Sequence, residues 1–161
     1  MKFNRLSMIM AAAMALAACS QTPAETSLKD AYADSFMIGC AVNPSHTSGR
    51  LEQANELLLT HFNAISPENC LKPEAVQPRP GVWTFEEADE YVQFGEEHDM
   101  WMRGHTLVWH TQTPYFYWEN PDGTPKSREE LIETMRAHIE TVAGRYAGRI
   151  DAWDGVNEII G

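Results

Sequence analysis

An asparagine followed directly by a glutamate stands at the end of a strand-like run close to the carboxyl terminus of the sequence. The run is Trp153–Val156, and the pair is Asn157 and Glu158. A carboxylic acid in such a place can protonate a departing oxygen, and the neighbouring amide can hold a hydroxyl group of the substrate. The pair suits chemistry on a sugar. Such chemistry needs further hydroxyl-binding groups from other parts of the chain.

Polar and aromatic side chains also follow two earlier hydrophobic runs. These side chains are Glu68, Asn69, Lys72, His105, Trp109, His110 and Gln112. A sugar ring has an apolar face and a rim of hydroxyls, so its site combines an indole with amide, imidazole and ammonium groups. Singly, each residue has a plainer explanation: Glu68 and Lys72 are spaced as a surface ion pair worth about 0–1 kcal/mol, and a lone histidine is most often a satisfied buried residue. Together at strand ends, they favour a saccharide site.

The hydrophobic runs alternate with segments of helical periodicity. We predict strands at residues 36–42, 62–65, 100–105 and 150–156, and helices from about 47 to 61, from about 84, and from 127 to 148. Each helix start has capping residues, which are Thr47 and Ser48, Thr84 and Glu87, and Ser127 and Glu130. The resulting βαβαβαβ order, with crossovers of this length, favours parallel pairing of the strands.

The predicted fold belongs to the α/β class, and the polar residues indicate which kind. A doubly wound sheet is one alternative, but no G-x-G-x-x-G or P-loop pattern follows any strand. The polar residues collect in the loops that follow the strands, where a (β/α)8 TIM barrel has its active site. Such a barrel typically has about 250 residues. We therefore expect the chain to contribute about the first four β/α units of a barrel.

Residues 1–18 have the pattern of an export signal, because two basic residues precede an uncharged apolar run. The run ends Leu16-Ala17-Ala18-Cys19, which resembles the lipobox of bacterial lipoproteins, so we expect Cys19 to be acylated. The alternative is an ordinary signal peptide that is cut nearby. We assign residues 19–33 to the lipidated cysteine and a tether, and residues 34–161 to the folded domain. The expected location is the bacterial cell envelope, periplasm-facing or at the cell surface, with membrane contact through the lipid anchor alone.

Charge and cysteine content narrow the classes of partner. Residues 1–18 contain two of the 12 Lys and Arg and none of the 23 Asp and Glu, so the formal charge changes from −11 to −13 without them. Nucleic acid and anionic membrane surfaces are therefore not expected as partners, whereas a neutral polymer is compatible with this charge. Cys40 and Cys70 form either a disulfide or two small buried hydrophobes. We expect no metal and no cofactor, because C-x-x-C and histidine-rich spacings are absent from the sequence.

Three ordered segments resemble the signatures of glycoside hydrolase family 10, the endo-xylanases. The segments are Phe62–Lys72, Arg103–Pro114 and Trp153–Glu158. The resemblance covers about residues 36–161. It implies the (β/α)8 barrel inferred above. It also implies retaining hydrolysis of internal β-1,4-xylosidic bonds, with xylan or xylo-oligosaccharides as the substrate.

The resemblance further implies roles for individual residues. Glu158 is the general acid/base, Asn157 holds the 2-hydroxyl of the sugar that is cleaved, and His110 has a supporting role. The sequence departs from the family pattern at Pro73, where many members have Trp, and at Gly155, where a β-branched residue is usual. Neither departure removes a catalytic group. By the same resemblance, the glycone subsites are lined by Glu68, Asn69, Lys72, His105, Trp109 and Gln112.

Retaining hydrolysis needs a second carboxylate, about 5–5.5 Å from the first. In the family this nucleophile lies on the seventh strand, which a chain with four predicted strands does not contain. Asp151 and Asp154 are too near Glu158 along the same strand to approach a substrate from the opposite side. We therefore expect the chain to be the N-terminal half of the catalytic domain and to be inactive by itself.

Two alternatives are compatible with these residues. One is a non-catalytic lipoprotein that binds xylan or another saccharide at the cell surface, either as a half barrel or as a dimer that completes the barrel. The sequence does not decide its oligomeric state. The other is a related cellulase or mannanase, in which Asn and Glu also follow a fourth strand. The segments that begin at Glu68 and His105 weigh against this second alternative.

Overall fold

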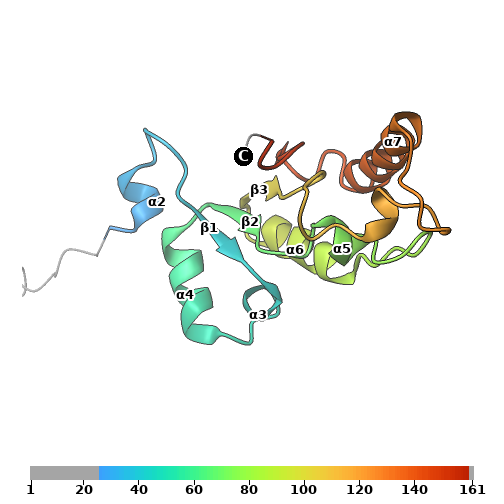
Figure 1. Ribbon diagram of the computed structural model, residues 1–161. Helices are drawn as coiled ribbons and strands as arrows, with labels where there is room; N and C mark the ends of the chain where they lie inside the picture. Colours follow the sequence, from blue (N-terminus) through green and yellow to red (C-terminus); the bar gives the residue numbers. More distant parts are fainter. Residues whose placement is uncertain (1–25, 160–161) are drawn as a thin grey trace, which may run out of the picture.

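A computed structural model describes residues 26–159, and its centre is a four-stranded parallel sheet (Figure 1). The predicted export signal and Cys19 lie outside the described residues. Neighbouring strands run parallel, so each connection is a crossover. The predicted βαβαβαβ order and the parallel pairing are thereby confirmed. In the order of their pairing, the strands are β1 (Gly39–Val42), β2 (Ala64–Pro67), β3 (Trp101–Gly104) and β4 (Ala152–Trp153).

Long and short helices occupy the connections between the strands. The long ones are α4 (Glu52–His61), α6 (Glu86–Glu97) and α7 (Arg128–Arg145). The short ones are α2 (Leu28–Ala31), α3 (Pro44–Thr47), α5 (Pro73–Val76) and the 3-10 turn η1 (Tyr115–Tyr117). Helices α2 and α4 lie at one end of the molecule and α7 lies at the other (Figure 1). No helix within residues 26–159 is both long enough and apolar enough to cross a membrane.

The first part of the described chain differs from the tether expected at residues 19–33. Helix α2 falls inside this segment, and the buried Ser27 caps it. The Leu28 N–H donates to His61 Nδ1 at 3.2 Å, and Lys29 Nζ donates to a backbone carbonyl of α4 at 2.6 Å. These contacts dock α2 on the end of α4. The folded body therefore begins by Ser27, so the predicted boundary was placed too late in the chain.

The chain between β1 and β2 does not form the single helix predicted there. Asn43 caps the short helix α3, and α4 begins only at Glu52. Gly49 separates the two helices in a left-handed conformation, with φ of +72°, which favours glycine and interrupts a helical path. The prediction that Thr47 and Ser48 cap a helix start was wrong, because these two residues end α3 instead.

One of the two predicted capping boxes is confirmed. Ser127 and Glu130 cap the start of α7 reciprocally, each side chain bonding the other residue's backbone N–H. The box predicted at Thr84 was wrong. Its hydroxyl donates to the Ala75 carbonyl, and α6 begins at Glu86 without a side-chain cap. A short hydroxyl side chain often bonds a nearby carbonyl in this way, in competition with capping.

Both outer strands of the described sheet are shorter than predicted. β1 begins at Gly39, and earlier in the chain Phe36 is stacked on Tyr32 at a ring-centroid distance of 4.9 Å. β4 has two residues, but its direction continues to Val156, which forms an isolated parallel bridge with Val108. Each outer strand has one neighbour within residues 26–159, so fewer of its residues are held in a ladder.

Helix α6 packs its apolar stripe on the sheet. A Cβ atom at Gly95 would overlap the side chain of Met102, so only glycine allows this close approach. The Tyr91 hydroxyl lies 2.9 Å from the carbonyl oxygens of both Ile65 and Arg103, and it joins β2 to β3. Burial raises the pKa of Tyr91, so the hydroxyl keeps its proton. The predicted stripe is confirmed by the burial of Ala88, Tyr91, Val92 and Gly95.

Cys40 and Cys70 are both free thiols, with Cys70 buried and Cys40 half-buried. Burial raises the pKa of Cys70 to about 12. A thiol in such surroundings stays protonated and packs as a small hydrophobe. Of the two interpretations of this pair, the structure therefore supports the small hydrophobes rather than the disulfide.

A buried histidine joins α7 to the loops beside it. His138 Nδ1 lies 2.5 Å from the hydroxyl of Tyr117, and that hydroxyl donates to Gln77 Oε1 at 2.8 Å. The Trp83 indole stacks on the imidazole at a centroid distance of 6.0 Å. Among the described residues, His138 Nε2 has no hydrogen-bond partner. Neutral groups thus surround the ring, and a positive charge there would be poorly solvated.

This environment predicts a specific dependence of stability on pH. Burial lowers the pKa of His138 to about 4, whereas an exposed histidine titrates near about 6.5. The unfolded chain therefore binds a proton in this window that the native chain does not, and the free energy of unfolding falls as the pH drops from about 6.5 to 4. The loss is roughly 3 kcal/mol across the window.

Urea denaturation near pH 7 and near pH 4.5 measures this effect. The substitution His138→Gln leaves a neutral residue at both pH values, so its pH dependence should be smaller by the contribution of one proton. His98→Gln, at an exposed histidine of the same chain, is the control and should keep the wild-type dependence. Equal pH dependence in wild type and His138→Gln would contradict the prediction.

Candidate active site at the carboxyl ends of the strands

The loops that follow β2, β3 and β4 meet around Trp109. Its indole N–H donates to Glu158 Oε2 at 2.9 Å, and Lys72 Nζ lies 4.9 Å from the ring centroid. The His105 ring lies beside the same indole, with centroids 6.3 Å apart. Residues that are far apart in the sequence thus form one continuous cluster, as their positions after the strands predicted.

Lys72 is buried and has two side-chain acceptors. Its Nζ donates to Asn69 Oδ1 at 2.9 Å and to Gln112 Oε1 at 2.5 Å. The side chain of Gln112 donates to Glu74 Oε1 at 3.0 Å, and the backbone carbonyl of Gln112 accepts from the Glu74 N–H at 3.0 Å. An ammonium group has three N–H donors. Within the described structure one of them remains for a hydroxyl of a ligand.

Glu68 begins the same loop, directly after β2, and contacts a residue that sequence reasoning missed. Its Oε2 accepts from Asn43 Nδ2 at 3.1 Å. The alternative of a surface ion pair between Glu68 and Lys72 is therefore not supported, because Lys72 is turned toward Asn69 and Gln112. Asn43 directly follows β1, so its place after a strand was the feature that could have identified it.

Backbone pairing places Asn157 and Glu158 beside the loop after β3. The Val108 N–H donates to the Gly155 carbonyl at 3.1 Å, and the Asn157 N–H donates to the Val108 carbonyl at 2.9 Å. Glu158 has a left-handed backbone, with φ of +52°, and its side chain is 56% exposed. His110 Nε2 lies 3.8 Å from Glu158 Oε2. The Glu158 side chain is thus exposed to solvent, while Trp109 and His110 contact its Oε2 atom.

The predicted residues are not all tied together to the same degree. Asn157 is half-buried and its backbone is fixed, but within residues 26–159 no hydrogen bond links its side-chain amide to another predicted site residue. His105 precedes a cis peptide bond to Thr106 and faces Asp154, whose Oδ2 lies 3.0 Å from His105 Nδ1. Sequence reasoning considered Asp154 only as a second catalytic carboxylate and so missed this contact.

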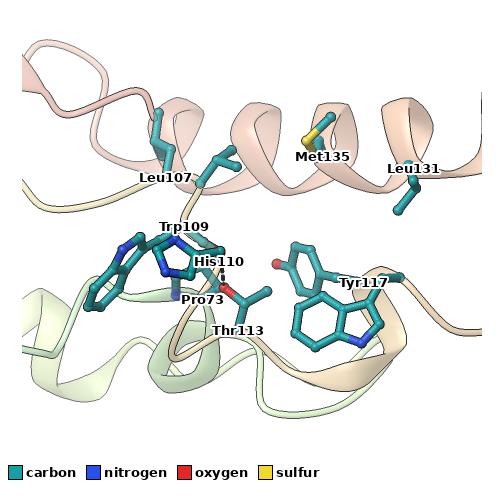
Figure 2. Close-up of a pocket in the computed structure, with 10 residues that line it drawn as sticks. Pro73, Leu107, Trp109, His110, Thr113, Tyr117, Leu131 and Met135 are labelled. Carbon is teal, nitrogen blue, oxygen red and sulfur yellow. Dashed lines mark hydrogen bonds between the residues drawn. The ribbon is translucent and has the colours of Figure 1, made fainter. Parts of the chain in front are cut away.

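An apolar cavity of about 250 Å³ lies behind Trp109 (Figure 2). The loop after β3 contributes one wall, where the Thr113 hydroxyl donates to the Trp109 carbonyl at 2.8 Å. Its walls are mostly hydrocarbon and aromatic, so the cavity suits an apolar group better than a sugar. We therefore place the hydroxyl-binding part of the site on the Lys72 side of the indole. The cavity is lined by Pro73, Leu107, Val108, Trp109, His110, Thr113, Tyr117, Trp118, Leu131 and Met135.

A carboxylic acid, an indole and hydroxyl-binding groups at the carboxyl ends of parallel strands define the site of a glycoside hydrolase built on β/α units. The chain belongs to glycosyl hydrolase family 10, whose family model matches residues 27–161. This match confirms the resemblance of the three sequence segments. It also confirms the predicted fold class, with the described sheet forming part of a (β/α)8 TIM barrel.

Individual relatives support the same assignment. Endo-1,4-beta-xylanase B of Paenibacillus barcinonensis is 46% identical over 134 residues, which cover 83% of this chain and 39% of that protein. Endo-1,4-beta-xylanase A of Halalkalibacterium halodurans is 42% identical over 145 residues, covering 83% of this chain and 36% of that protein. The chain thus spans less than half of the length of these relatives.

Solved structures match over a similar span. A family 10 endoxylanase retrieved from sugarcane soil metagenome has a TM-score of 0.80 and 45% identity, covering 85% of this chain and 41% of that one. A psychrophilic family 10 endo-beta-1,4-xylanase has a TM-score of 0.80 and 36% identity, covering 84% and 41%. At these identities the likeness extends to the sequence as well as to the fold.

Replacing Lys72 tests whether the buried network holds the site together. Lys72→Met keeps most of the hydrocarbon volume, but it leaves Gln112 Oε1 without its donor and leaves Asn69 Oδ1 with Gln112 Nε2 alone, at 3.2 Å. We expect the free energy of unfolding to fall by about 1–3 kcal/mol, measured by urea denaturation. Lys126→Met is the matched control, because Lys126 Nζ bonds only the half-buried Thr134 hydroxyl at 2.8 Å in the described structure. A loss no larger than that of Lys126→Met would contradict this role.

Proposed function

We propose that this chain forms the sugar-holding and acid/base part of a retaining endo-1,4-β-xylanase. The observation that carries the proposal is the shared Trp109 indole, which bonds the Glu158 carboxylate at its edge and has the Lys72 ammonium over its face. One aromatic ring thus joins the proton donor to the hydroxyl-binding groups. The family membership and the endo-1,4-beta-xylanases among the relatives support xylan as the substrate.

The proposed reaction uses Glu158 twice. As an acid, it gives its proton to the glycosidic oxygen while a second carboxylate attacks the anomeric carbon and forms a glycosyl-enzyme intermediate. As a base, it then takes a proton from the water that hydrolyses this intermediate. Asn157 holds the 2-hydroxyl of the reacting sugar, and His110, at 3.8 Å from the carboxylate, supports Glu158. The remaining predicted residues bind the glycone: Glu68, Asn69, Lys72, His105, Trp109 and Gln112.

The nucleophile is proposed to come from the part of the family domain that this chain does not span. The two aspartates near Glu158 already have structural partners. Asp151 Oδ2 accepts the Met102 N–H at 2.7 Å, and Asp154 accepts from Arg103 at 2.7 Å. Neither carboxylate is therefore assigned the role of second carboxylate. The chain of 161 residues is accordingly expected to bind xylo-oligosaccharides without hydrolysing xylan.

A chimera tests the proposal directly. Residues 27–159 replace the matching segment of the Paenibacillus barcinonensis relative, and release of reducing ends from xylan is measured. The chimera should be active, and Glu158→Gln should lower its kcat by about 10²–10⁴-fold, since the general acid is lost. Glu129→Gln, at an exposed carboxylate in the first turn of α7, is the matched control and should leave the rate unchanged. Full activity with Glu158→Gln would overturn the assignment.

We also propose that Cys19 is lipidated and anchors the exported protein at the cell envelope. The lipobox-like segment that ends at Cys19 supports this proposal. Expression in a bacterial host followed by detergent phase partitioning tests it. The wild-type protein should enter the detergent phase, and Cys19→Ala should move to the aqueous phase. Partition of the wild-type protein into the aqueous phase would count against the anchor.

A further inference from the structure

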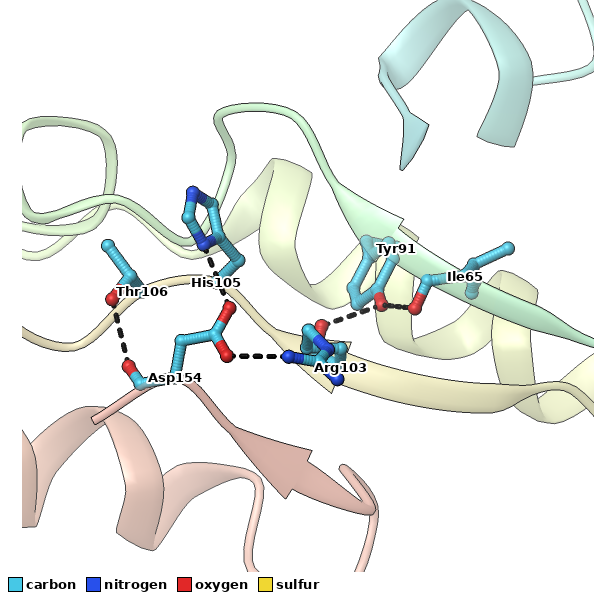
Figure 3. A network of polar contacts seen from close by, with 6 residues as sticks. All are labelled: Ile65, Tyr91, Arg103, His105, Thr106 and Asp154. Atoms are coloured by element: carbon cyan, nitrogen blue, oxygen red, sulfur yellow. Dashed lines mark hydrogen bonds and ion pairs between the residues drawn. The ribbon is translucent and has the colours of Figure 1, made fainter. Parts of the chain in front are cut away.

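Asp154 is fixed by its backbone immediately after β4 (Figure 3). Its N–H donates to the Gly104 carbonyl at 3.0 Å. Its own carbonyl accepts from the Leu107 N–H at 3.1 Å and from the Thr106 hydroxyl at 2.8 Å. These three bonds to the end of β3 and the loop after it fix the backbone from which the Asp154 side chain extends.

The Asp154 carboxylate has a different partner on each oxygen. Arg103 Nη1 donates to Oδ1 at 2.7 Å, and His105 Nδ1 lies 3.0 Å from Oδ2. A carboxylate can only accept, so the imidazole nitrogen that faces it must carry a proton. In the neutral ring, Nε2 is then a lone-pair acceptor. Figure 3 shows this second nitrogen directed away from Asp154.

We propose that Asp154 is a positioning residue that holds His105 as the Nδ1–H tautomer, so that His105 accepts a hydrogen bond from a sugar hydroxyl. The tautomer follows from the described contacts alone. The identity of the ligand rests on the proposed function. The residue that was excluded above as a nucleophile thereby gains a role in substrate binding.

The direction of this hydrogen bond matters because of Lys72. Lys72 and His105 both lie against the Trp109 ring, and an ammonium group can only donate. A sugar hydroxyl that contacts both groups would accept from Lys72 and give its own proton to His105 Nε2. With the other tautomer, both protein groups would donate to the same oxygen and the hydroxyl proton would be left without this acceptor. The tautomer therefore sets the orientation of the bound hydroxyl.

Arg103 determines what a change at Asp154 does. The Arg103 side chain is 47% exposed, so its ion pair with Asp154 contributes little to stability. The guanidinium of Arg103 can only donate hydrogen bonds. In Asp154→Asn, the amide oxygen must face Arg103, which leaves the NH2 group facing His105 Nδ1. That nitrogen must then accept, and the proton moves to Nε2. Removing Arg103 as well frees the amide to turn its oxygen back toward His105.

Nitrogen-15 NMR of the histidine rings in the full chain tests the tautomer, above the pH at which the rings are charged. We expect His105 of the wild type to be protonated at Nδ1, Asp154→Asn to be protonated at Nε2, and Asp154→Asn/Arg103→Met to return to Nδ1. Arg103→Met alone is the control and should keep the wild-type tautomer. A wild-type proton on Nε2, or no change in Asp154→Asn, would overturn the inference. The wild-type spectrum decides it even if a variant does not fold.

Calorimetric titration with xylohexaose tests the consequence for binding. Asp154→Asn should bind about tenfold more weakly than the wild type, as the loss of one well-directed hydrogen bond predicts, and the double variant should recover most of the affinity. Equal affinity for Asp154→Asn would overturn the hydroxyl-binding role of His105. A wild-type chain with the expected tautomer but no affinity for xylohexaose would overturn the proposed function and leave the tautomer assignment standing.

Discussion

The parallel pairing of the segment after β3 with the segment after β4 determines where the candidate site lies. The pairing starts inside the strands, at Arg103 and Ala152, and it recurs past the ends of both strands at Val108 and Val156. Between these two pairings the segment after β3 has one residue more than the segment after β4, and the renewed pairing at Val108 brings the loop with Trp109 beside Glu158. A different pairing partner for Val108 would turn alternate side chains to the opposite face and would separate the indole from the acid.

Much of this arrangement could be predicted from local pattern. Hydrophobic runs indicate the strands, and polar residues directly after them indicate the site, because parallel strands bring their carboxyl ends to one edge. The reciprocal cap at Ser127 also depends on adjacent residues. The parts that could not be predicted depend on partners distant in sequence. Asn43 after β1 bonds Glu68 after β2, and Asp154 bonds His105. The Thr84 hydroxyl donates to the Ala75 carbonyl.

The site also depends on backbone conformations that its residue types do not prefer. Gln112 and Glu158 both have left-handed φ values, +47° and +52°, which cost most non-glycine residues free energy. Both residues were identified as site residues from the sequence alone. At Gln112 the conformation is held by contacts of both its carbonyl and its side chain with Glu74. The folded surroundings thus impose a geometry that the local sequence would not adopt by itself.

The central place of Trp109 has a consequence for how this site can diverge. The face of its indole contacts the Lys72 ammonium, and the indole N–H donates to the Glu158 carboxylate. The backbone carbonyl of Trp109 accepts from the Thr113 hydroxyl. A mutation of this ring therefore removes contacts of both Lys72 and Glu158 in one step. Under the proposed function, adaptation to a new polysaccharide then proceeds through residues that touch only one of these partners. The indole itself is expected to be the slowest position to change over evolutionary time.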